Sequence, residues 1–303
     1  MRRVKLNIWV LTMAAMAAIA AVAAVAAVAA IASLSATARA ELNCSQDTFC
    51  LLSEVSGDKT VFTAINKNRY LPLTVQLHLT LENLELRDGA SAPFVLQGGE
   101  RRQLFALAPI DKSAAWEYRY EYTWVGGDFR ARHRADQLYR LPYKADRTYE
   151  VSQSCNGSYS HTDHGKYAID FDMPIGTPVL AARAGRVVDI KQDSSRGGEG
   201  KQYENDGNYV TILHDDATLG HYFHLHPNTV KVALGQQVAA GDMLGRAGNT
   251  GYSSGPHLHL EVVEVQLADG PKDDPHQMSV PITFDAQRGK VTCPADGVRL
   301  KVK

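Results

Sequence analysis

The segment Gly255-Pro256-His257-Leu258-His259-Leu260-Glu261 alternates polar and apolar side chains. Successive side chains of an extended strand point to opposite faces of a sheet, so His257 and His259 lie side by side while Leu258 and Leu260 face the other way. The pattern predicts a strand with one face in a hydrophobic core and two imidazoles on the other. Alone, a His-x-His pair is a weak sign of a metal or acid–base site, because many such pairs are incidental.

Residues on both sides of this segment predict further strands. The expected strands cover residues 178–182, 186–190, 209–214, 220–225 and 257–265. Glycines separate these runs, as tight turns between strands require. We therefore expect residues 150–303 to form one domain, a compact antiparallel β-sheet with little helix.

Residues 41–145 have a different pattern of apolar and polar residues. Leucine and valine occupy every second position of residues 73–81, and Tyr118, Tyr120 and Tyr122 repeat this alternation. Short alternating strands separated by glycines predict an accessory β-sandwich of roughly a hundred residues. No residue here indicates catalysis, and the solitary His78 is expected at the surface. Residues 128–148, rich in Arg, Lys and Asp, are expected to connect the two parts.

Residues 1–40 have the features of an export signal. Basic residues at the start precede a long alanine-rich run, which ends in the small-x-small pattern Ala38-Arg39-Ala40. This pattern predicts cleavage after Ala40. The alternative is a retained membrane anchor, because the uncharged run is long enough to cross a bilayer. Either reading predicts an exported protein of the periplasm or cell envelope, or a secreted one.

Loss of residues 1–40 would leave an acidic chain. It would remove four basic residues and no acidic one, so that 28 Lys and Arg face 33 Asp and Glu. This balance argues against general binding to nucleic acids or anionic membranes. The oligomeric state is not predicted.

All four cysteines lie beyond the expected signal, and an even number in an oxidising compartment predicts two disulfides. Of the three possible pairings we favour Cys44–Cys50, a local loop, with Cys155–Cys293 joining the two ends of the second domain. A cysteine zinc site is disfavoured because the chain has no Cys-x2-Cys.

Most of the eleven histidines fall between positions 161 and 259. His161 and His164 precede Asp170, which stands between the apolar residues Ile169 and Phe171 and is expected to face inward. A buried carboxylate needs a partner, and a metal ion is one. Two histidines, one aspartate and a water molecule give the tetrahedral arrangement of a catalytic zinc site.

The order of these motifs resembles the M23 (LytM/lysostaphin-type) zinc metallopeptidases. The resemblance covers roughly residues 155–265 and rests on His161 to Asp170, on Gly220-His221-Tyr222-Phe223-His224-Leu225, and on residues 255–261. Connecting motifs at 173–179, 207–210 and 235–241 occur in the same order. The resemblance implies a duplicated-hybrid-type β domain that cleaves amide bonds in peptidoglycan stems or crosslinks.

Position by position, the resemblance implies that His161, Asp170 and His259 bind Zn²⁺ and that His224 and His257 are the catalytic histidines. In one respect the chain departs from the family pattern, which commonly places the first histidine four residues before the aspartate, where Lys166 stands here. Ser160-His161-Thr162 matches family variants with a longer loop, and His164 remains the rival ligand. His221, three residues before His224 on a strand, is expected to face away, and His214, His226 and His276 are also expected to be bystanders.

Two other functions fit the same sequence. A non-catalytic regulator or wall-binding module would share the fold, although such proteins usually lack a zinc ligand and every expected position is filled here. A secreted zinc protease acting on proteins would use the same site. Lipoyl or phosphotransfer carriers are disfavoured, because the chain has no carrier lysine signature and phosphotransfer is cytoplasmic.

Overall fold

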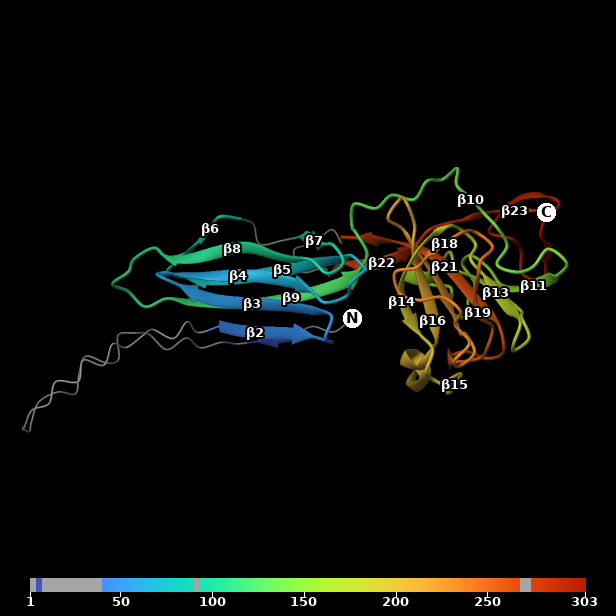
Figure 1. Ribbon diagram of the computed structural model, residues 1–303, viewed down its shortest axis with the longest axis horizontal. Coiled ribbons are helices and arrows are strands. Elements are labelled where there is room, and N and C mark those ends of the chain that lie inside the picture. The colour runs from blue at the N-terminus through green and yellow to red at the C-terminus, as the bar shows by residue number, and fades with distance from the viewer. Residues whose placement is uncertain (1–3, 7–39, 90–92, 268–273) are drawn as a thin grey trace, which may run out of the picture. The chain divides into compact units, whose positions relative to one another are not determined.

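The computed structural model of the chain describes residues 4–6, 40–89, 93–267 and 274–303. It is mainly β and divides by internal contacts into two compact units. The first unit comprises the residues up to Lys67 together with Val75–Trp124, and the second comprises Asn68–Thr74 together with Val125–Lys303. Figure 1 shows the strands of both units along the chain.

The first unit contains two sheets. One has the strand order β1-β9-β5-β7 and the other has the order β2-β3-β4-β8-β6. Their strands are β1 (Val4–Leu6), β2 (Ala40–Ser45), β3 (Phe49–Ser56), β4 (Lys59–Asn66), β5 (Leu73–Glu82), β6 (Leu84–Arg87), β7 (Phe94–Leu96), β8 (Arg101–Pro109) and β9 (Glu117–Gly126).

Aromatic side chains fill the space between these two sheets. Phe62 of β4 lies 4.9 Å from Phe105 and meets the ring of Tyr118 from the opposite sheet edge-on at 5.3 Å. Tyr118, Tyr120 and Tyr122 are all buried, whereas Arg119 and Glu121 between them are exposed. Two sheets packed face to face over alternating inward residues have the architecture of a β-sandwich. His78 on β5 is half-buried.

Most of the expected export signal, residues 7–39, lies outside the described residues. Val4–Leu6 form the short strand β1, which pairs antiparallel with β9, and β2 begins at Ala40. Among the helices that the structure describes, none combines the length and hydrophobicity needed to cross a membrane.

The second unit is built on a nine-stranded sheet with the order β18-β14-β16-β17-β21-β12-β11-β25, to which β22 adds by pairing with β21. Its strands are β11 (Thr148–Gln153), β12 (Ile169–Phe171), β14 (Gly185–Lys191), β16 (Tyr209–Leu213), β17 (Leu219–Phe223), β18 (Gln237–Val238), β21 (Leu258–Gln266), β22 (His276–Ser279) and β25 (Arg299–Lys301). Neighbouring strands of this sheet run antiparallel. The expected antiparallel sheet is confirmed.

Shorter elements complete the second unit. The strands β10 (Leu138–Tyr139), β23 (Thr283–Ala286) and β24 (Gly289–Thr292) form one sheet, β13 (Pro178–Leu180) pairs with β19 (Met243–Arg246), and β15 (Gly197–Gly198) pairs with β20 (Gly251–Tyr252). The helical segments of the described residues are two 3-10 helices, η2 (Asp163–Gly165) and η3 (Lys201–Asp206).

The segment 128–148 is part of this second unit and not a separate connector. Tyr139, Leu141 and Tyr143 are fully buried in its hydrophobic core, and β10 pairs with β23. The surrounding charges obscured this apolar alternation in the sequence.

Both expected disulfides are present. Cys44–Cys50 closes a hairpin between β2 and β3, and Cys155–Cys293 joins residues 138 positions apart in the second unit. The pairing prediction is confirmed.

Candidate metal centre

Strand pairing brings Asp170 and His259 together. In the antiparallel ladder between β12 and β21, Asp170 lies directly opposite His259, so both side chains project from the same face. Nδ1 of His259 is 2.9 Å from Oδ1 of Asp170. Ile169 and Phe171 on either side of Asp170 are completely buried in the core, as the sequence predicted.

His161 reaches the same carboxylate from the loop after β11. Its Nδ1 is 2.8 Å from the carbonyl oxygen of Ser154, to which it donates, and this leaves Nε2 as an acceptor. Nε2 lies 3.2 Å from Oδ1 of Asp170, yet it is buried and has no hydrogen-bond partner among the described residues. A buried polar atom left unpaired in this way is costly unless a ligand satisfies it.

The three side chains offer one ligand atom each, and these atoms lie within 4.8 Å of one another. Burial raises the pKa of Asp170, but the adjacent charge of His259 outweighs it and holds this pKa far below its usual range. Burial lowers the pKa of His259, but the charge of Asp170 raises it to about 10. The site thus favours added positive charge, which a divalent cation can supply in place of the proton.

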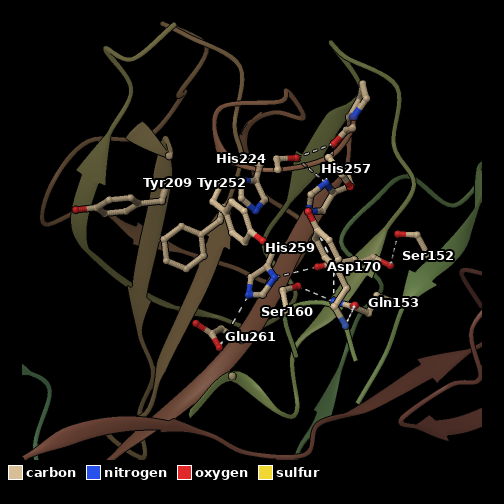
Figure 2. Close-up of a pocket in the computed structure, with 18 of the residues that line it drawn as sticks. Ser152, Gln153, Ser160, Asp170, Tyr209, His224, Tyr252, His257, His259 and Glu261 are labelled. Atoms are coloured by element: carbon tan, nitrogen blue, oxygen red, sulfur yellow. Dashed lines mark hydrogen bonds and ion pairs between the residues drawn. The ribbon is translucent and has the colours of Figure 1, made fainter. Parts of the chain in front are cut away.

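His224 and His257 lie beside this cluster with their ring centroids 4.5 Å apart (Figure 2). His224 follows the last residue of β17 with a positive φ of 62°, which turns its backbone out of the strand. Nδ1 of His224 donates to the carbonyl of Thr250 at 2.7 Å, and Nδ1 of His257 donates to the carbonyl of Gly255 at 2.8 Å. Nε2 of His257 lies 3.8 Å from Oδ2 of Asp170.

Burial, together with the neighbouring rings of His257 and His259, lowers the pKa of His224 to about 3. His224 is therefore neutral at pH 7, with Nε2 available as a proton acceptor.

Asp170, His224, His257 and His259 line one open pocket with a volume of about 900 Å³, whereas His161 is fully buried. Tyr159 and Tyr252 stack on its wall with centroids 6.0 Å apart, and Phe223 lies beside the ring of His259 at 5.7 Å. Hydroxyl and amide groups of Ser152, Gln153 and Ser160 also line the pocket (Figure 2). Mixed aromatic and polar walls of this kind suit an extended peptide.

The rival first ligand, His164, lies elsewhere. It is exposed, with Nδ1 3.0 Å from Sδ of Met278 and its ring 4.6 Å from that of His276. His214 is buried, and its Nδ1 donates to the carbonyl of Ala184. Neither His214 nor His226 lines the pocket.

His221 was expected to face away from the site, but it projects from the same face of the sheet as its partner Glu261. This residue is buried on β17, its Nδ1 lies 2.9 Å from Oγ1 of Thr211, and it stands opposite Glu261 of β21. Because His224 lies beyond the end of β17, strand alternation between the two histidines does not apply. Glu261 lines the pocket as well, although it was not among the site residues expected from the sequence. Its signal was present, since it stands two residues after His259 on one strand.

Part of the second unit matches known proteins. Residues 164–273 match the model of peptidase family M23, so that His161 precedes the matched segment. Peptidoglycan DD-endopeptidase ShyA of Vibrio cholerae is 39% identical over 94 residues, which are 31% of this chain and 19% of ShyA. Lysostaphin of Staphylococcus staphylolyticus is 31% identical over 126 residues, which are 42% of this chain and 24% of lysostaphin.

Among solved structures, the catalytic domain of lysostaphin from Staphylococcus simulans aligns at 26% identity with a TM-score of 0.28, and the alignment covers 40% of this chain and 85% of that domain. The chain spans about a fifth to a quarter of the length of the curated relatives named above. The second unit therefore contains a segment, residues 164–273, that matches peptidase family M23.

Proposed function

We propose that the second unit is a zinc-dependent endopeptidase that hydrolyses amide bonds in the peptide stems or crosslinks of peptidoglycan. The observation that carries this proposal is the convergence of His161, Asp170 and His259, with the buried Nε2 of His161 left unpaired. Two nitrogen donors and one carboxylate oxygen form the ligand set of a catalytic zinc site with one position open.

The substrate class follows from the relatives and from the pocket. ShyA is named a peptidoglycan DD-endopeptidase, and other matched relatives are named glycyl-glycine endopeptidase and lysostaphin. An open pocket with stacked tyrosines on one wall accommodates a polymer-bound peptide, which a closed cavity would exclude.

His161, Asp170 and His259 would hold the zinc ion, each through the atom that already faces the cluster. When bound, zinc supplies Lewis acidity, which polarises a carbonyl group and makes water a stronger nucleophile at neutral pH.

The two remaining histidines supply proton transfer and charge stabilisation. The Nδ1–H of each is fixed by a backbone carbonyl, so Nε2 is the atom available to the reactants. Neutral His224 would accept a proton from the attacking water, and His257 would stabilise the oxygen that gains negative charge. A peptide bond placed between the cluster and this pair meets both groups.

We further propose that the protein acts outside the cytoplasm, as residues 1–40 and the two disulfides favour. The first unit would then be an accessory domain that positions the substrate or binds a partner in the envelope.

Mass spectrometry of muropeptides tests the proposal. Purified peptidoglycan is digested with the zinc-loaded protein, with and without a chelator, and the new termini identify the bond that is cut. We expect chelator-sensitive release of shortened stems or opened crosslinks. Cleavage of a denatured protein substrate but not of peptidoglycan would favour the secreted-protease alternative. Zinc binding without any hydrolysis would favour a non-catalytic module.

A further inference from the structure

One of the four histidines at the candidate metal centre is oriented differently from the others. His161, His224 and His257 each direct Nδ1 at a backbone carbonyl, at 2.8, 2.7 and 2.8 Å respectively. His259 instead uses Nδ1 to face Asp170, so that Nε2 is its distal nitrogen. No backbone carbonyl fixes this nitrogen among the hydrogen bonds of the described residues. The charged group that it faces is Glu261, whose Oε2 lies 3.9 Å away (Figure 2).

Glu261 reaches this place because of strand geometry. It stands two residues after His259 on β21, so both side chains project from the same face. On the neighbouring strand β17, Phe223 pairs with His259 and His221 pairs with Glu261. These two rows enclose the carboxylate, whose side chain is only 15% exposed.

Histidines surround the carboxylate of Glu261, with His259 on the same strand and His221 opposite it on β17. In the part of the chain that the structure describes, the one ion pair of Glu261 is with His259. A buried carboxylate without Lys or Arg beside it is costly to keep unless it serves an adjacent cation.

We propose that Glu261 is a positioning residue for the metal centre, whose carboxylate faces the Nε2 side of the His259 ring and so keeps Nδ1 directed at the cluster with Asp170 and His161. This inference rests on the proposed zinc-dependent function. A carboxylate on the distal nitrogen of a ligating histidine fixes its tautomer and ring orientation and raises its basicity. In this role the carboxylate acts through His259.

The experiment measures zinc affinity and not activity. The full chain is titrated with Zn²⁺ against a chromophoric chelator of known affinity, as wild type, Glu261→Ala and Glu261→Gln. We expect the alanine variant to bind zinc about 10–100-fold more weakly. The glutamine variant keeps the shape of the side chain and an oxygen that faces Nε2 but loses the charge, so its loss of zinc affinity should be smaller than that of the alanine variant.

Glu264→Gln is the matched control. Glu264 lies on the same strand, but three residues further from Glu261, so it projects from the opposite face, where it accepts a hydrogen bond from the backbone of His133. Its zinc affinity should equal that of the wild type. A purely structural role for Glu261 predicts lowered thermal stability with an unchanged zinc Kd in the folded variants.

The outcomes separate this inference from the proposed function. Zinc affinities within about twofold of wild type for both Glu261 variants would overturn the inference and leave the peptidase proposal intact. If the wild-type protein binds zinc and the variants lose affinity as expected, but peptidoglycan is not cut, the inference about Glu261 stands and the peptidase proposal is overturned. If Glu261→Ala does not fold, the isosteric Glu261→Gln variant decides the question. A partial loss of its zinc affinity supports the inference, and an unchanged zinc affinity contradicts it.

Discussion

Strands β9 and β21 both alternate between two faces, but the face that is a hydrophobic core in β9 is part of the candidate site in β21. The inward positions of β9 carry Tyr118, Tyr120 and Tyr122, whose rings stack along the strand about 6.3–6.5 Å apart and fill the core of the first unit. The corresponding face of β21 carries His259 and Glu261, which need charged partners once they are buried. The comparison teaches that periodicity identifies the face of a strand, whereas residue chemistry decides whether that face is a core or a site.

The largest expected difference between these strands concerns metal. His259→Ala removes a ligand and should abolish both bound zinc and hydrolysis, with activity falling by roughly 10³-fold or more because the metal supplies the main activation. Tyr120→Phe on β9 is the control and should leave zinc content and activity unchanged. Elemental analysis of the purified variants and a peptidoglycan release assay measure both quantities. Stoichiometric zinc in His259→Ala would remove His259 from the ligand set.

The second prediction separates a ligand from a catalytic histidine on adjacent positions of one face. His257→Ala should retain zinc but lose about 10²–10⁴-fold in activity, the usual contribution of acid–base groups. His226→Ala, a histidine outside the pocket, should retain both. Full activity of His257→Ala would contradict the role given to this residue.

The sequence predicted most of what depends on local pattern. The alternation at residues 257–265 identified β21, and the pairing of the cysteines was also predicted. The sequence could not decide features that depend on the path of a loop or on the register between paired strands. The choice between His161 and His164 required the carbonyl of Ser154 to fix His161 in the cluster. Glu261 and His221 became partners only once β17 and β21 were aligned.

The two disulfides extend the comparison to the two units. In the chain-entropy model, a crosslink between residues 138 apart stabilises by about 5 kcal/mol and one between residues 6 apart by about 2 kcal/mol. Cys155→Ser with Cys293→Ser should therefore destabilise the second unit about 3 kcal/mol more than Cys44→Ser with Cys50→Ser destabilises the first. Denaturant unfolding, followed by proteolysis or hydrogen exchange in each unit, gives both values. Equal losses would show that loop length does not govern these bonds.

The smallest expected effect concerns a buried histidine of the second unit that lies away from the metal centre. Burial lowers the pKa of His214 to about 4, and its Nε2 is buried without a partner among the described residues. The unfolded chain binds a proton near pH 6.5, before the folded chain does, so stability is greatest above that pH and is lost as pH falls toward 4.

A full shift of this size would cost about 2–3 kcal/mol by pH 4. His214→Asn keeps a donor for the carbonyl of Ala184 but does not titrate, so the variant should lose less stability than the wild type over the same range. Urea unfolding at several pH values, compared between the two proteins in the same buffers, isolates this contribution from that of the metal centre. Parallel stability curves of the two proteins between pH 4 and 7 would mean that His214 is protonated as readily in the folded chain as in the unfolded one. The buried surroundings of His214 would then tolerate a charge, as the site face of β21 does.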